Sequence, residues 1–366
     1  MNSCHCLTRK VFLIATAAVL TLSLARRAFA GNLPEDIIAQ DIAAQNNHDI
    51  NSFLSLRPSG TDFPEDRSVY QNIWRTNPQD NFIYNIISAK LVGERAIPLE
   101  VAEKVTNIES FLQKDSVVKT FYVAIDYKVK VESKYLYNGT NYRFYLLAFD
   151  HGKYSIVEAS SAPVPLLESL GFGFGTTAER KVSSLQSQAL KTGVLELPDG
   201  NIVSRVTAYT QPPTIRVYIT QSGTISIVNF ADYVKNVLPK EWLTYWSAAA
   251  LQTGALAVKM YGWYRTIYPH QPALGFDVYD SPRYDQWYMA GSAQAVTNSA
   301  VDAVSGVGFA QSDGSIFMPQ YWNGVSQVYG TGGVGLRVRP TPDTTGKPLT
   351  ILNDGASPDC VTCPPL

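Results

Sequence analysis

Apolar positions near the start of the chain follow a helical period. Isoleucines at helical spacing open residues 34–57 and predict a leading helix. His48 and Asp49 come where this pattern fades, so we expect them in a helix-ending turn.

Further along, the period changes to strict alternation. Residues 121–131 alternate over a long stretch and predict a strand, and residues 142–149 and 154–157 predict two more. Asn138-Gly139 and residues 150–152 separate them as turns. A leading helix followed by antiparallel strands predicts an α+β fold.

This order of elements resembles the NTF2-like (SnoaL-like) fold over residues 31–160. The resemblance implies helices packed on a curved antiparallel sheet, in the shape of a cone, and carries no catalytic motif. In enzymes of that fold a His/Asp pair can line the cone, which leaves a second interpretation of His48 and Asp49 beside the turn.

Prolines and glycines then interrupt the pattern. Ser160, Ser161, Pro163 and Pro165 precede spaced glycines and a polar stretch, which is typical of a connecting segment, and we expect a linker over residues 161–205.

Regular patterns return in the second half of the chain. Residues 214–219 and 223–228 predict a hairpin, and residues 230–238 predict a short amphipathic helix that Pro239 should break. A long Ala- and Leu-rich helix is expected over 247–266, with Ser247 as its N-cap.

Length and charge narrow the classes of function. A chain of 366 residues usually holds two domains. The formal net charge of −1 and the lack of a basic block after the N-terminus argue against nucleic acid as a partner. Residues 330–335 are glycine-rich but lack the Lys-Ser/Thr ending of a phosphate loop, so we expect no nucleotide.

The N-terminal residues have the pattern of a secretory signal. Arg9 and Lys10 precede an apolar run, residues 11–24, that is too short to span a bilayer comfortably. Small residues at Ala28 and Ala30 then favour cleavage after Ala30. We expect a secreted, periplasmic or cell-envelope protein; an uncleaved anchor is the alternative.

After cleavage, the chain would keep two cysteines, Cys360 and Cys363. A zinc site needs a second ligand pair, and none lies nearby in the sequence, so we expect no metal and no other cofactor. A local disulfide or a loose tail suits the spacing best, and a catalytic dithiol is a further alternative.

A set of ordered motifs lies in the second half of the chain. The sequence Asp-Tyr-Val-Lys-Asn-Val-Leu-Pro-Lys-Glu ends at Glu241, and Trp246 follows five residues later. The Ala- and Leu-rich residues 250–261 come next, then Asp-Gln-Trp-Tyr-Met-Ala-Gly at 285–291 and Ala-Val-Asp-Ala-Val-Ser-Gly at 300–306. In this order and spacing the motifs resemble those of the SpoIID/LytB family (stage II sporulation protein D, amidase enhancer), which has a long helix, an Asp-Gln-Val-Tyr-x-Gly element and a helix ending at these places.

The resemblance implies a lytic transglycosylase that cleaves peptidoglycan glycan strands. In that chemistry Glu241 would be the general acid and base, and a second carboxylate is not needed. A carboxyl that stays protonated near neutral pH must be partly buried. The side chains expected to bind the glycan are Trp246, Lys259, Gln286, Tyr288 and Tyr321. The expected partners are glycan strands and a cell-wall amidase.

The sequence also departs from the family pattern. Gly254 stands where the helix usually has Gln, Lys259 where it has Arg, and Met260 where it has Thr. The downstream Ser/Thr-rich segment is replaced as well. These departures leave a second hypothesis open, a catalytically degenerate module that holds glycan or assists an amidase.

The predicted organisation has five parts. They are a signal peptide (1–30), an NTF2-like domain (31–160), a linker (161–205), a SpoIID/LytB-like domain (206–330) and a C-terminal tail (331–366).

Overall fold

The fold is taken from a computed structural model of the chain. It describes residues 33–60, 63–106, 108, 117–150, 152–192, 195–200, 202–204, 211–305, 308, 315–320 and 339–340. Within these residues, no helix has the length and apolar character needed to cross a membrane. The predicted signal segment, the glycine-rich stretch, Tyr321 and the two C-terminal cysteines lie outside the described residues.

The first helices form one side of the N-terminal half. They are α2 (Pro34–Asn46), α3 (Ile50–Ser55), α4 (Arg67–Thr76), the 3₁₀ turn η1 (Pro78–Asp80) and α5 (Phe82–Asn85). His48, with φ 54°, turns the chain between α2 and α3, and the Asp49 carboxylate caps α3 by accepting from the Ser52 N–H at 3.0 Å. The predicted helix-ending turn is therefore confirmed.

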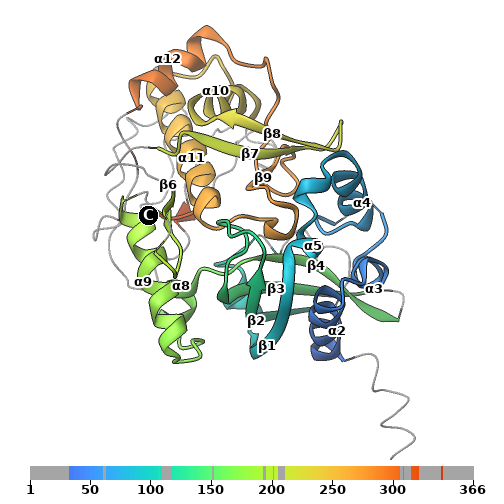
Figure 1. The fold of residues 1–366 in the computed structure, drawn as a ribbon. Helices are drawn as coiled ribbons and strands as arrows, with labels where there is room; N and C mark the ends of the chain where they lie inside the picture. Colours follow the sequence, from blue (N-terminus) through green and yellow to red (C-terminus); the bar gives the residue numbers. More distant parts are fainter. Residues whose placement is uncertain are drawn as a thin grey trace, which may run out of the picture.

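A four-stranded antiparallel sheet packs against these helices (Figure 1). Its strands are β1 (Ile86–Ile97), β2 (Val117–Val129), β3 (Gly139–Asp150) and β4 (Lys153–Ser161), in that spatial order, and α6 (Leu99–Ala102) follows β1. The three predicted strands are present, and β1 is an addition that its mixed pattern did not reveal. The α+β class is confirmed, whereas the NTF2-like cone stays a prediction.

The segment expected as a linker contains regular structure. It forms α8 (Val164–Ser169), α9 (Thr177–Thr192) and the short pair β5 (Leu195–Glu196) and β6 (Ile202–Ser204). Leu167 and Val182 are buried in the same cluster as Tyr122 of the sheet. Apolar contacts thus hold this segment against β2, even though its sequence is rich in Pro and Gly.

The C-terminal half combines a small sheet with a helical layer (Figure 1). The sheet has β7 (Thr214–Ile219) between β8 (Thr224–Asn229) and β9 (Val278–Tyr279). The helices are α10 (Phe230–Glu241), α11 (Ala248–Ile267), the 3₁₀ turn η2 (Pro272–Leu274) and α12 (Ala295–Ala303); β10 (Pro319–Gln320) pairs with β11 (Arg339–Pro340).

Two details of the C-terminal helices bear on the predictions. The Ser247 hydroxyl accepts from the Ala250 N–H at 3.3 Å, which confirms the predicted N-cap of α11. The predicted break at Pro239 is wrong, because α10 continues through it to Glu241. A proline in the last turn removes only one backbone hydrogen bond, so the helix tolerates it there.

One of the buried clusters spans both halves of the chain. Tyr218, Leu274 and Phe276 from the C-terminal half belong to the same buried cluster as the side chains beneath the N-terminal sheet. Polar contacts join the halves too, since the Ser161 N–H donates to the Pro269 carbonyl at 3.2 Å. The positions of the predicted domain boundaries stay a prediction.

Candidate functional site

Glu241 is the last residue of α10, and its position follows from the pattern of that helix. Tyr233, Val237 and Glu241 are spaced four residues apart and therefore share one face, and the first two are buried. Asn229 fixes the start of the helix, where its side chain accepts from two backbone N–H groups. The glutamate is half-buried at the helix end.

The surroundings of Glu241 favour its protonated form. Burial raises the pKa of the carboxyl above its usual value, and the hydrogen bond from the Trp287 N–H to Oε1, 2.6 Å long, opposes this only in part. The C-terminal end of a helix also disfavours a negative charge. These surroundings thus shift the carboxyl towards the protonated form that a proton donor needs.

Gln286 and Tyr288 lie next to α10, as the sequence predicted. The Tyr233 hydroxyl donates to Gln286 Oε1 at 2.7 Å, and the Tyr233 and Tyr288 rings stack with centroids 5.6 Å apart. However, Gln286 is only 1% exposed and Tyr288 7% exposed. Their side chains therefore hold the loop that follows Asp285 against α10, and they offer little surface to a ligand.

The exposed side chains near Glu241 are aromatic. Tyr245 is 80% exposed and Trp287 is 41% exposed, with the Lys240 Nζ 4.5 Å from the centroid of a Trp287 ring. Trp246 is half-buried and packs against the C-terminal core. Sequence reasoning missed Trp287, although its place between Gln286 and Tyr288 was a signal for it.

Lys259 lies in the interior of the helical layer. Its side chain is buried, and Nζ donates to the Val304 carbonyl at 2.6 Å and the Ser305 carbonyl at 3.3 Å, just after α12. Burial lowers the pKa of the ammonium to about 8. A cation there complements the negative C-terminal end of α12. Helix packing therefore explains the position of Lys259, and this position does not support the predicted role in substrate binding.

Another departure from the family pattern also has a packing reason. A Cβ built on Gly254 would lie 2.5 Å from Trp242 Cε2, so the indole of Trp242 fills the space of a side chain on α11. Met260, at the position of the usual Thr, is fully buried. These positions face the interior of the helical layer.

A buried ionic cluster surrounds Asp285, at the start of the loop formed by residues 286–289. His270, which lies between α11 and η2, is 2% exposed, and its Nδ1 lies 3.0 Å from Asp285 Oδ1. Its Nε2 lies 3.8 Å from Glu158 Oε2 of β4. Partners that are distant in the sequence therefore surround this side chain.

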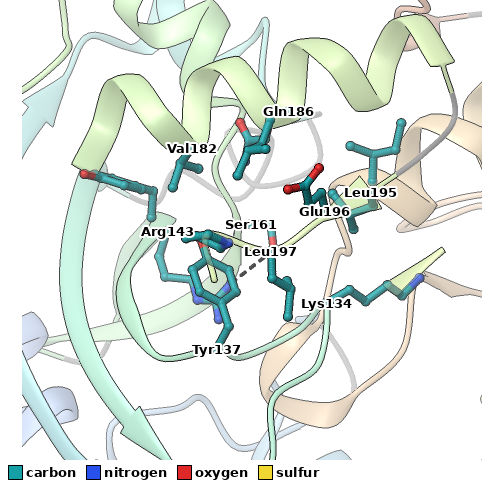
Figure 2. Close-up of a pocket in the computed structure, with 13 residues that line it drawn as sticks. Lys134, Tyr137, Arg143, Ser161, Val182, Gln186, Leu195, Glu196 and Leu197 are labelled. Carbon is teal, nitrogen blue, oxygen red and sulfur yellow. Dashed lines mark hydrogen bonds between the residues drawn. The ribbon is translucent and has the colours of Figure 1, made fainter. Parts of the chain in front are cut away.

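A small cavity lies elsewhere, between β3, α9 and the end of α11 (Figure 2). Its volume of about 40 Å³ has room for a few waters at most. Arg143 lines it and donates to Ser161 Oγ at 3.1 Å. Glu241 and the loop that follows Asp285 do not line this cavity, so it is not the candidate site.

No metal site is apparent in the described part of the chain, where no three His, Cys, Asp or Glu side chains gather so that they could hold an ion. Tyr321 falls outside the described residues, so its predicted role stays a prediction.

The C-terminal half is thus an α+β domain in which a half-buried carboxyl accepts a hydrogen bond from the backbone of the exposed Trp287. Residues 218–308 match the family model described as SpoIID: Stage II sporulation protein. The chain therefore contains a SpoIID family domain in its C-terminal half, as the motifs predicted, and this domain indicates a sporulation- or cell-wall-related function. A comparison with curated proteins found no match.

Proposed function

We propose that this protein is a cell-envelope lytic transglycosylase that cleaves peptidoglycan glycan strands, with Glu241 as its general acid and base. The observation that carries the proposal is the half-buried Glu241 carboxyl, whose pKa burial raises, inside the matched SpoIID span. The predicted signal segment supports a location outside the cytoplasm.

The proposed reaction needs a single carboxyl that gives and takes one proton. Protonated Glu241 donates its proton to the glycosidic oxygen while the bond from that oxygen to the anomeric carbon breaks. The 6-hydroxyl of the same sugar then bonds to the anomeric carbon and returns a proton to Glu241. The second carboxylate of ordinary glycosidases is not required, because no water is added.

The aromatic side chains around Glu241 suit a sugar ligand. Sugar rings have apolar faces that pack on aromatic rings. Tyr245, four residues after Glu241, and Trp287, whose N–H bonds the Glu241 carboxyl, both expose their rings. In this proposal Trp246, which is half-buried, shapes the base of the same surface. Gln286 and Tyr288 contribute by fixing the loop that carries Trp287.

The test uses purified mature protein and glycan strands from which the peptides have been removed. Wild-type protein should release anhydro-disaccharides, and Glu241→Gln should release none. The matched control is Glu103→Gln, which alters an exposed glutamate on the N-terminal half and should leave release unchanged. Equal release by the wild type and Glu241→Gln would overturn the role of Glu241.

The alternative function is a glycan-binding or amidase-enhancing module without catalysis. It is favoured by the burial of Lys259 and by the Trp242 ring that occupies the space beside Gly254. Saturable binding of glycan without anhydro products would support this alternative. A wall amidase whose rate increases when the protein is added would identify it as the enhancer.

A further inference from the structure

The ionic cluster behind the loop draws its members from several elements of the C-terminal half. Asp285 has a fully buried side chain that contacts His270 Nδ1 at 3.0 Å and accepts from the Tyr261 hydroxyl at 2.6 Å and the Tyr279 N–H at 2.8 Å. Arg265 of α11 places Nε 3.3 Å from the same carboxylate. Four groups therefore fix a single side chain.

The cluster continues into the N-terminal half through Glu158. This β4 residue is 1% exposed, faces His270 Nε2, and accepts from the Thr106 hydroxyl at 2.9 Å and the Ser160 hydroxyl at 2.6 Å. A chain of contacts thus runs from the sheet of one half to the loop of the other.

The charges in this cluster are balanced. Burial alone would lower the pKa of His270, but the carboxylates of Asp285 and Glu158 raise it above its usual value, against the opposing charge of Arg265. Burial alone would raise the pKa of Asp285, but His270 and Arg265 lower it to about 2. His270 and Arg265 therefore face two acidic side chains, Asp285 and Glu158.

Residues 286–289, directly after Asp285, form neither helix nor strand. Their position depends on side-chain anchors, and the loop supplies the Trp287 N–H that bonds Glu241. We propose that Glu158, His270 and Asp285 are positioning residues through which the N-terminal sheet holds this loop, and with it the carboxyl of Glu241, in place. The inference rests on the proposed function only where it names Glu241 as the group to be positioned.

The physical reason is that buried ion pairs specify position more than they add stability. Removing one charge leaves its partner buried and uncompensated, so the surrounding segment relaxes. Glu158 contacts His270, and His270 contacts Asp285 at the start of the loop. A change at Glu158 should therefore alter the loop, although the two are far apart in sequence.

The experiment compares Glu158→Gln with Glu179→Gln in the full chain. Glu179 is a matched control: it is also fully buried, and its carboxylate accepts from the Tyr122 hydroxyl and the Gly175 N–H, neither of which belongs to the cluster. Amide hydrogen exchange is followed across the chain, and the ring protons of the four histidines are titrated by NMR.

In Glu158→Gln, we expect exchange over residues 285–288 to increase about tenfold relative to the rest of the C-terminal half. The His270 pKa should fall, because one of the two carboxylates that raise it is gone. Glu179→Gln should show neither change. Wild-type exchange of the loop and an unaltered His270 titration in Glu158→Gln would overturn the proposal, as would the same changes in both variants.

Activity on glycan adds an independent measurement. With an active wild type, Glu158→Gln should lower kcat several-fold with little change in KM, because glycan still binds but the proton donor is misplaced. If the wild type cuts no glycan while the loop responds as described, the proposed function fails and the positioning role stands. If glycan is cut and the loop does not respond, the proposed function stands and the positioning role fails.

Discussion

Restoring the family's side chain at Gly254 should destabilise this protein. The added Cβ would lie 2.5, 2.6 and 2.7 Å from three atoms of the Trp242 indole, whereas carbon atoms in contact prefer about 3.5–4.0 Å. The indole is rigid and only 2% exposed, so it cannot move aside without disturbing the helical layer.

The size of the effect follows from two opposing contributions. Alanine in place of glycine inside a helix stabilises by about 1 kcal/mol. Overpacking a dense core destabilises by roughly 1–3 kcal/mol, and more when the neighbour is rigid. For Gly254→Ala we therefore expect a net loss of about 0–2 kcal/mol, towards the upper end because the indole is rigid, and for Gly254→Gln a larger loss. Activity on glycan should not improve, because Trp242 directly follows Glu241 and anchors it.

Urea denaturation of the full chain measures the effect as a lower midpoint at an unchanged slope. The rescue variant is Gly254→Ala combined with Trp242→Leu. Its destabilisation should be smaller than the sum of the single variants by more than about 1 kcal/mol, because the smaller side chain leaves room for the methyl group. A Gly254→Ala protein at least as stable as the wild type would refute the reasoning.

Three further predictions concern buried charges. Burial raises the pKa of folded Glu241 above 4.5, so the wild type should lose stability relative to Glu241→Gln as the pH rises from 4.5 through that pKa. Urea denaturation of both proteins at several pH values measures this loss. The Lys259 pKa is instead lowered, from 10.5 to about 8, so the wild type should gain roughly 3 kcal/mol over Lys259→Met between pH 8 and 10.5; a flat difference would contradict the burial of this charge. Asp285→Asn should destabilise by about 3–5 kcal/mol in urea, because it leaves His270 and Arg265 without their carboxylate, whereas the exposed control Asp126→Asn should change little.

Local patterns in the sequence were sufficient for much of the fold. The strict alternation over 121–131 and the Asn138-Gly139 turn predicted β2 and the start of β3, because alternation and turn chemistry act over short distances. Ser247 likewise predicted the start of α11, which it caps. β1 was not predicted, because only a few of its side chains are buried and the strand shows no clean alternation of apolar and polar residues.

Tertiary contacts explain what the sequence did not reveal. Proline and glycine in the segment after Ser161 indicated a linker, yet the apolar residues of α8 and α9 find partners on the sheet. His270 gave no local signal, since its partner Glu158 is more than a hundred residues away. Such pairings become visible only once the chain is folded.

The candidate site was predictable where it follows motif spacing. Glu241, Gln286 and Tyr288 lie close together, as the ordered motifs predicted. Lys259 does not join them, because a conservative change of charge in the sequence cannot show that the ammonium binds the end of α12. Trp287 was missed because the family motif has an aliphatic residue there.

The central claim is that Glu241 drives cleavage of glycan by the sugar's own hydroxyl. The most direct test is to digest peptide-free glycan in ¹⁸O-labelled water with the wild type and with Glu241→Gln, and to weigh the new chain ends. The account predicts anhydro ends without ¹⁸O from the wild type and no new ends from the variant. Reducing ends that carry ¹⁸O, or anhydro ends formed equally by both proteins, would contradict it.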